Sequence, residues 1–346
     1  MSLAKYLTLA PLTERKQFVA AAHQSSPYVG VWPWSDSDGF GVQLANPAVL
    51  PSGTGYEVDF SPSGNALAVA HDSGAYVSVY GFSDAGFGAK FANPASALPF
   101  GGRGVRFDPG GGALAIATFS SPYIHAYAWS GSGFGAKFSN PATLPTGTAN
   151  RITFAPDGSA VAVAVNTSPF LSVYPWSGSG FGARFANPAT LPTSNTQDLA
   201  FSPAGDALAF VGNGSPYINV YAWSGAGFGA KFANPGTLPP GGVFGVDFSP
   251  DGDAIALAVG SSPYVIAYPW SGAGFGTKFT NPAVLPSNFC SSVKFSPSGG
   301  AMVLGQHTTN PRINAYAWSG AGFGAKFSDP ASFPAGNTNG IAFTEI

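Results

Sequence analysis

The sequence predicts an all-β fold, a seven-bladed β-propeller of four-stranded antiparallel blades. Three observations support this prediction. A unit of 47 or 48 residues recurs seven times, its hydrophobic pattern has a period of two residues, and turn residues interrupt it every 8 to 12 residues. Repeats of this length bury their apolar faces against neighbouring repeats. One aromatic position marks all seven units: Trp34, Phe82, Trp129, Trp176, Trp223, Trp270 and Trp318.

The first predicted strand of each unit is short and ends in Phe. Residues 246–248, for example, read Val-Asp-Phe, and residues 249–252 follow as Ser-Pro-Asp-Gly. Proline presets φ at the second position of a turn, and glycine suits the fourth. We therefore expect a tight turn between the first and second strands.

The second and third strands of the unit differ in side-chain size. Residues 66–70 are all small or medium aliphatic residues, whereas Tyr127 and Trp129 share one face of the third strand in another unit. A sheet with one bulky and one small-residue face must press the first into the second face of the next copy. Seven such steps close a ring around a channel. The Trp or Phe positions are then core residues, with stacking on a ligand as the alternative.

The two ends of the chain complement each other. Residues 17–23 read as a second strand with no first strand before it, and residues 339–343 read as a first strand with nothing after it. We therefore expect residues 339–346 to complete the blade formed by residues 17–50, so that the propeller spans residues 17–346.

The predicted outer strand of six units carries a cation: Lys90, Lys137, Arg184, Lys231, Lys278 or Lys326, with Gln43 in the odd unit. Lysine on an exposed edge prevents pairing between sheets. Binding of an anionic partner by the ring of cations is the alternative.

Residues 1–16 do not fit the repeat and form a separate leader. They combine large apolar side chains with a charged end, Glu14-Arg15-Lys16. Such a segment either packs on its own propeller or is buried in a partner. The candidate docking residues are Leu3, Tyr6, Leu7, Leu9 and Leu12.

The order of residues within the unit resembles the WD40 family of propellers. The resemblance rests on Val-x-Phe-Ser-Pro-Asp-Gly, a small-residue strand and a strand ending in Trp, and covers nearly everything after residue 16. Ser271 stands after Trp270 where the family has Asp, and no Gly-His precedes the first strand. The chain is therefore WD40-like, and its similar blades resemble recently amplified propellers of bacteria and bacteriophages. The resemblance implies a non-enzymatic binding scaffold.

Composition argues against several classes of partner. The net charge of −2 and the absence of a basic run give no footprint for nucleic acid. No secretion signal and no run of 18 apolar residues is visible. We expect a protein that binds no membrane and is cytoplasmic or virion-associated. Cys290 is the one cysteine, the histidines are scattered, and no metal or cofactor is expected.

The first strands place charged residues that differ from unit to unit beside the channel. Neighbouring units should pair Asp59 with Arg106, Arg151 with Asp198, and Asp247 with Lys294. These charges either satisfy each other or form a ligand site at the channel mouth. The full set of candidates is Glu57, Asp59, Arg106, Arg151, Asp198, Asp247 and Lys294.

Three functions are compatible with this pattern. The favoured one is a non-enzymatic structural scaffold that binds protein partners in a larger assembly, such as a bacteriophage particle. The second is a multivalent lectin-like propeller that binds glycans. The third is an enzyme with a single site at the channel mouth, since propeller sites are assembled across blades.

Overall fold

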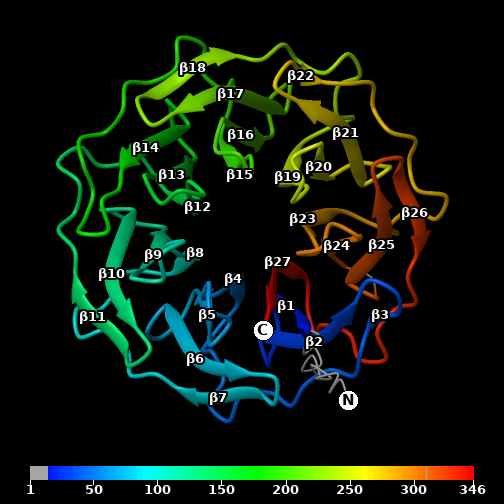
Figure 1. The fold of residues 1–346 in the computed structure, drawn as a ribbon. Helices are drawn as coiled ribbons and strands as arrows, with labels where there is room; N and C mark the ends of the chain where they lie inside the picture. Colours follow the sequence, from blue (N-terminus) through cyan, green and yellow to red (C-terminus); the bar gives the residue numbers. More distant parts are fainter. Residues whose placement is uncertain (1–14, 309) are drawn as a thin grey trace, which may run out of the picture.

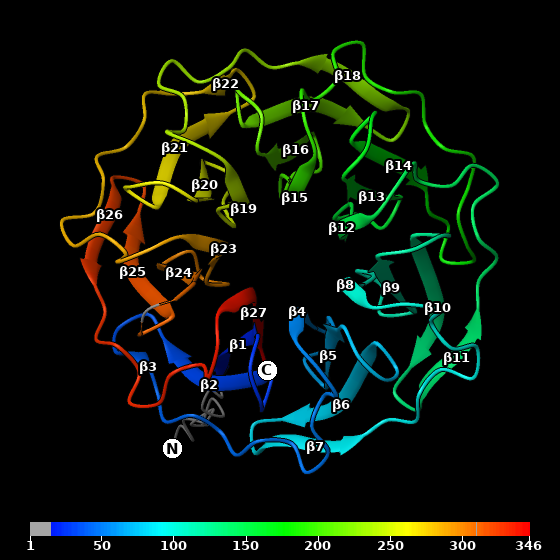
Figure 2. The same ribbon diagram turned by 180° about the vertical axis from the view of Figure 1, so that it is seen from behind.

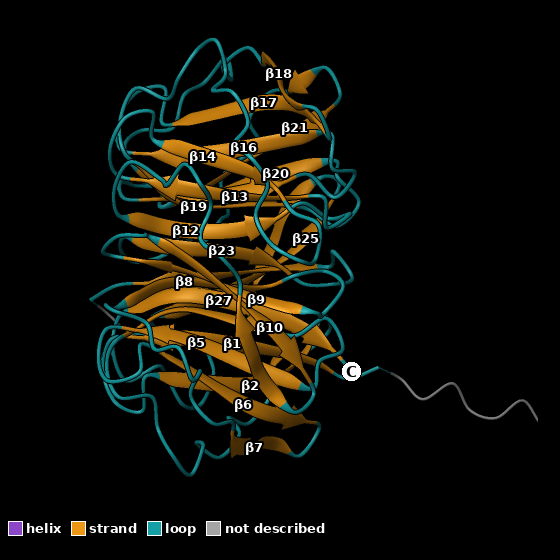
Figure 3. Ribbon diagram, turned by 90° about the vertical axis from the view of Figure 1, so that its left-hand side faces the viewer, coloured by secondary structure: helices purple, strands orange, loops and turns teal. Residues whose placement is uncertain are grey.

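The computed structural model describes residues 15–308 and 310–346. Seven antiparallel sheets stand around a central axis as the blades of a propeller, which confirms the predicted fold class (Figures 1 and 2). Seen from the side, the described part of the chain consists of strands and loops (Figure 3). The predicted leader residues Leu3, Tyr6, Leu7, Leu9 and Leu12 lie outside the described residues.

Each blade runs from an innermost strand to an outer one. The blades, from first to seventh, are β27 (Thr338–Glu345), β1 (Gln17–His23), β2 (Val29–Ser35) and β3 (Gly39–Phe40); β4 (Gly55–Phe60), β5 (Ala66–His71), β6 (Val77–Ser83) and β7 (Gly86–Lys90); β8 (Gly102–Phe107), β9 (Ala113–Thr118), β10 (Ile124–Ser130) and β11 (Gly133–Lys137); β12 (Ala149–Phe154), β13 (Ala160–Val165) and β14 (Leu171–Pro175); β15 (Thr196–Phe201), β16 (Ala207–Gly212), β17 (Ile218–Ser224) and β18 (Gly227–Lys231); β19 (Val243–Phe248), β20 (Ala254–Val259), β21 (Val265–Ser271) and β22 (Gly274–Phe275); β23 (Cys290–Phe295), β24 (Ala301–Gln306), β25 (Ile313–Ser319) and β26 (Gly322–Lys326).

The outer strand is shorter in three blades, and proline explains the difference. Pro33, Pro175 and Pro269 occupy the position in the third strand that is Gly or Ala in the other blades. Proline cannot donate a hydrogen bond to the neighbouring strand. The outer strand is reduced to two residues in β3 and β22, and to the single bridge between Trp176 and Phe181 in the fourth blade.

The C-terminal strand closes the ring as the sequence predicts. β27 pairs antiparallel with β1 from Gln17 opposite Glu345 to His23 opposite Thr338. Two further backbone hydrogen bonds, 2.9 and 3.0 Å long, join Lys16 and Ile346. Residues from both ends of the chain therefore complete the first blade (Figure 1).

The hydrophobic core lies between the blades. One cluster joins Ala162 and Val173 of the fourth blade to Leu208 and Trp223 of the fifth. The indole of Trp223 is 6% exposed and meets the rings of Phe185, Phe201 and Phe228 edge to face, with centroids 5.1–5.6 Å apart. The marker aromatic is thus a core residue, as we expected.

Trp223→Ala should lower the free energy of unfolding by about 3–5 kcal/mol, because a cavity opens between two sheets. Lys231→Ala, on the outer strand of the same blade, should change it by less than about 0.5 kcal/mol. Chemical denaturation of the two variants measures the difference. Equal stability of the two variants would contradict this description of the core.

Candidate functional site

The innermost strands surround the central axis (Figures 1 and 2), and their residues differ from blade to blade. A register shift after the first residue marks these strands, as between Gly55 and Glu57 of β4. The third residues of the innermost strands are Glu57, Gly104, Arg151, Asp198, Gly245, Ser292 and Gly340, and the fifth residues are Asp59, Arg106, Thr153, Ala200, Asp247, Lys294 and Ala342. All seven predicted site residues therefore lie at these two levels of the channel.

Two of the three predicted charge pairs are present. A guanidinium nitrogen of Arg106 lies 3.4 Å from Asp59, and the ammonium of Lys294 lies 2.8 Å from Asp247. Each carboxylate also accepts a backbone hydrogen bond from the next blade, from Phe107 N–H at 2.8 Å and Phe295 N–H at 2.9 Å respectively. Neighbouring innermost strands are therefore tied together by side chain and backbone.

Arg151 forms its ion pair with Glu57 at 2.6 Å rather than with Asp198. Glu57 belongs to the second blade and Arg151 to the fourth, so the arginine passes the intervening strand β8. Gly104 allows β8 and β12 to approach each other closely here, because a Cβ there would lie 3.1 Å from the Arg151 Cα. The other Glu57 oxygen lies 3.0 Å from Arg106. The sequence could not indicate this pairing, since it skips a blade.

The Arg151 guanidinium also donates to backbone carbonyls around the channel. Its partners are Asn339 O at 2.9 Å, Asn150 O at 3.0 Å, Arg103 O at 3.2 Å and Tyr56 O at 3.4 Å. These carbonyls belong to the first four blades. The Arg151 side chain therefore extends along the innermost strands of these four blades.

Two channel carboxyls have raised pKa values. Burial raises the pKa of Asp59 to about 6, although Arg106 and the Phe107 N–H favour its ionised form. Burial, and then the nearby Glu57, raise the pKa of Asp198. Asp198 accepts a hydrogen bond from Val246 N–H at 3.0 Å. A carboxyl with a pKa of about 6, such as that of Asp59, can exchange a proton near neutral pH, as general acids and bases must.

A small cavity opens where the innermost strands end. Its volume is about 240 Å³, and its polar lining is Asp59, Arg106 and Lys294. Its apolar wall consists of Phe295 and residues 341–343. We call this end of the channel the Asp59 mouth. The cavity brings an acid–base group and two cations to one surface.

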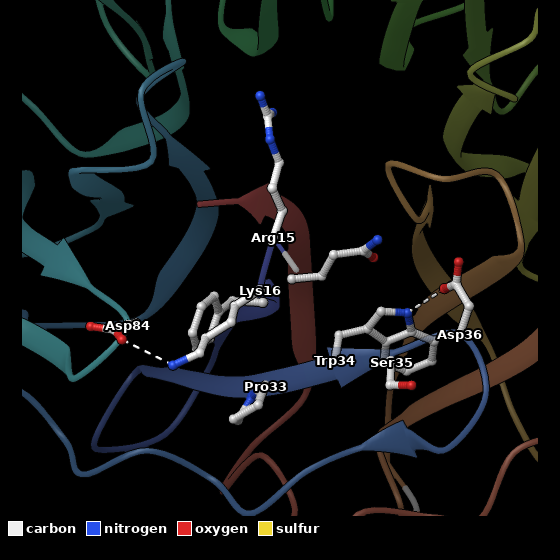
Figure 4. Close-up of a pocket in the computed structure, with 9 residues that line it drawn as sticks. Arg15, Lys16, Pro33, Trp34, Ser35, Asp36 and Asp84 are labelled. Carbon is white, nitrogen blue, oxygen red and sulfur yellow. Dashed lines mark hydrogen bonds and ion pairs between the residues drawn. The ribbon is translucent and has the colours of Figure 1, made fainter. Parts of the chain in front are cut away.

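A larger surface groove of about 760 Å³ lies beside the first blade (Figure 4). Its Lys16–Asp84 ion pair, 2.9 Å long, has side chains that are 62% and 59% exposed. The Trp34 indole donates to Asp36 at 2.6 Å on its other side. An ion pair this exposed is weak and screened by solvent, whereas the channel holds buried carboxyls with raised pKa values, so the channel is the better candidate.

Other polar groups that the sequence singled out have structural roles. Burial lowers the pKa of His23, His71 and His125 to about 4, so these imidazoles are neutral at pH 7. Lys90, Lys137, Lys231 and Lys278 each donate to the Asn three residues later, and Lys326 contacts Asp329. Within residues 15–308 and 310–346, no group of three or more His, Cys, Asp or Glu could hold a metal ion.

The opposite end of the channel carries residues that the sequence reasoning missed. The second residue of each innermost strand lies there, and Arg103 stands out among them, stacked on the rings of Tyr56 and Phe119. Comparison of the repeats at the position one residue earlier in the chain would have revealed that this residue also differs from unit to unit. The seven residues are Tyr56, Arg103, Asn150, Gln197, Phe244, Ser291 and Asn339.

Comparison with known proteins defines the class by its fold. No model of a protein family matches the chain, and no curated protein sequence matches it either. Solved structures do: a protein from Lactobacillus plantarum has a TM-score of 0.75 at 13% identity, over 95% of this chain and 99% of the other.

Two similar structures carry enzyme names. A periplasmic gluconolactonase of Pseudomonas aeruginosa has a TM-score of 0.71 at 14% identity, over 95% of this chain and 99% of its own. A putative 6-phosphogluconolactonase of Bacteroides fragilis has a TM-score of 0.74 at 12% identity, over 97% and 99%. These likenesses establish a shared propeller fold.

The comparisons correct the favoured function. We expected a non-enzymatic scaffold in a larger assembly such as a bacteriophage particle, because the WD40-like repeat implied one. Two of the similar propellers carry lactonase names, one of them putative, and these names contradict that expectation. It came from the blade pattern, which determines how the sheets stack and says nothing about the channel. Among the described residues, no helix is long and apolar enough to cross a membrane, and a cytoplasmic or virion-associated location stays a prediction.

The raised pKa of Asp59 predicts a stability effect with a definite sign. The native carboxyl has a pKa of about 6, against about 3.9 in an unfolded chain. Ionised Asp59 therefore opposes folding, and this cost is absent well below pH 4 and grows until the pH passes about 6. Asp59→Asn removes the cost, so the stability of this variant relative to the parent should increase by about 2 kcal/mol between about pH 4.5 and about pH 7.5.

Urea denaturation of both proteins at the two pH values measures this difference. Asp157→Asn, in an exposed turn, is the control and should show no such gain. A difference between Asp59→Asn and the parent that does not change with pH would show that the Asp59 carboxyl titrates normally in the folded protein.

Proposed function

We propose that this propeller is an enzyme that hydrolyses a small cyclic ester, a lactone, in the cavity at the Asp59 mouth. The observation that carries the proposal is one carboxyl with a pKa of about 6 beside two cations in a cavity of about 240 Å³. Clefts that hold drug-sized ligands are roughly 300–1,000 Å³, so this one suits a small molecule. The names of the similar propellers support the choice of a lactone.

The side chains present can perform each step of such a hydrolysis. Asp59 accepts a proton from a water molecule as the water oxygen attacks the ester carbonyl carbon. The cationic groups of Arg106 and Lys294 stabilise the negative charge that develops on the carbonyl oxygen. The ring C–O bond then breaks, and the departing oxygen takes the proton from Asp59. The product is the open hydroxy acid, and the carboxylate is regenerated.

The Glu57–Arg106 and Asp247–Lys294 ion pairs keep these cations in place. Arg106 contacts Glu57 at 3.0 Å on one side and Asp59 at 3.4 Å on the other, while Lys294 contacts Asp247 at 2.8 Å. A charge held by a fixed partner needs no reorganisation during the reaction. This explains why the channel contains more carboxylates than the chemistry itself uses.

A panel of γ- and δ-lactones, with and without a phosphate group, tests the proposal. The parent should hydrolyse at least one of them faster than the buffer does, and Asp59→Asn should lower kcat/KM by about 100-fold or more. The activity of the parent should rise as the pH passes about 6, because the base must be ionised.

Asp157→Asn is the matched control, since it removes an exposed carboxyl that does not line the cavity, and it should keep full activity. Hydrolysis that survives unchanged in Asp59→Asn, or no lactone hydrolysis by the parent above the buffer rate, would overturn the proposal.

A further inference from the structure

At the opposite end of the channel, which we call the Arg103 mouth, residues of three blades surround the side chain of Arg103. Arg103 lies on β8, and its guanidinium carbon lies 5.4 Å from the ring centroid of Tyr56 on β4 and 4.4 Å from that of Phe119. Its Nη1 donates to the Asn150 side chain on β12 at 2.9 Å. The Asn150 amide in turn donates to Thr196 O at 2.6 Å. The guanidinium is therefore held in one orientation.

Arg103 differs from the other channel cations because it has no carboxylate partner. Arg106, Arg151 and Lys294 each form an ion pair of 3.0 Å or less, whereas no carboxylate in the described part of the chain pairs with Arg103. Its Nε is buried without a hydrogen-bond partner among these residues. Burial, and then the like charge of Arg151, lower the pKa of Arg103 to about 10.

A partly buried cation without a counter-ion is costly unless a ligand supplies the missing charge. The aromatic rings of Tyr56 and Phe119 offset part of that cost, but they carry no negative charge that could neutralise the guanidinium. The charge of Asp72 acts on the neighbouring Tyr56 hydroxyl: burial, and then Asp72, raise the pKa of Tyr56. Guanidinium groups bind carboxylate and phosphate oxygens well, because their N–H groups match the spacing of those oxygens.

We infer that the Arg103 mouth binds a small oxyanion, a carboxylate or a phosphate group, on the guanidinium of Arg103. The Nη2 side of this guanidinium makes no hydrogen bond to the residues that the structure describes, and it remains available to the anion. Asn150 keeps the guanidinium aligned, and the positive charge of Arg151 lies beneath it.

This site is separate from the lactone cavity and does not rest on the proposed function. Arg103 and Arg106 lie three residues apart on β8, or about 10 Å along a strand. Between their levels the Arg151 side chain extends along the innermost strands, with its Nε 2.6 Å from Glu57 and its Nη2 2.9 Å from Asn339 O. The two sites therefore consist of different residues at different levels of the channel.

Isothermal titration of the whole chain with inorganic phosphate and, separately, with D-gluconate tests the inference and distinguishes the two kinds of oxyanion. At least one probe should bind the parent with a Kd below about 10 mM, and Arg103→Gln should weaken that binding at least about tenfold. Arg184→Gln is the matched control, because it removes a half-buried arginine on the outer part of the fourth blade. Its binding should equal that of the parent.

A second pair of variants keeps the test decisive. Asn150→Asp places a carboxylate beside Arg103 Nη1 and should also weaken anion binding. This variant tests the inference even if Arg103→Gln does not fold. Asp157→Asn, which removes an exposed carboxyl from a turn, should bind the probe as the parent does. Equal binding by the parent and Arg103→Gln, or no binding of either probe to the parent, would overturn the inference.

Discussion

Packing between blades is the interaction on which the rest of this structure depends. One face of every sheet presents a large aromatic residue such as Trp223, and the face of the neighbouring sheet presents small residues such as Ala162. Because each blade buries its apolar side chains only against its neighbours, the ring must close before the core is complete. The antiparallel pairing of β27 with β1 provides that closure.

A core placed between the blades leaves the innermost strands free to vary. Their outward neighbours, such as β5 and β9, are buried throughout and aliphatic except at the last residue, so the apolar core does not require a particular side chain at the channel. Charged residues there satisfy each other across blades, as Arg106 does with Glu57 and Asp59. The propeller can therefore bury carboxyl groups beside its channel, and burial raises the pKa of Asp59.

The sequence predicted the fold well because repetition and side-chain size specify it locally. The strand order, the closing blade and the buried position of Trp223 follow from the period and from the alternation of large and small residues. The lost outer strand of the fourth blade could have been foreseen from Pro175, since proline at that position removes a donor to the edge. We expected an outer strand in every blade and therefore missed its loss from the fourth blade.

The candidate site was only partly predictable, for a physical reason. Pairing of adjacent blades gave Asp59 with Arg106 and Asp247 with Lys294. It did not give the ion pair of Arg151 with Glu57, because these residues lie two blades apart. Stacking of Arg103 on Phe119 was also beyond the sequence, because Phe119 comes from a loop after β9. The interpretation as a scaffold failed because blade similarity carries no information about channel chemistry.

The central claim is that the channel holds one carboxyl poised between acid and base near neutral pH. Its most direct test is an NMR titration of protein with ¹³C-labelled aspartate, in which Asp59→Asn identifies the Asp59 carboxyl resonance. Our account predicts an inflection near pH 6 for that resonance. An inflection at or below about pH 4, the ordinary range of an aspartate, would contradict it.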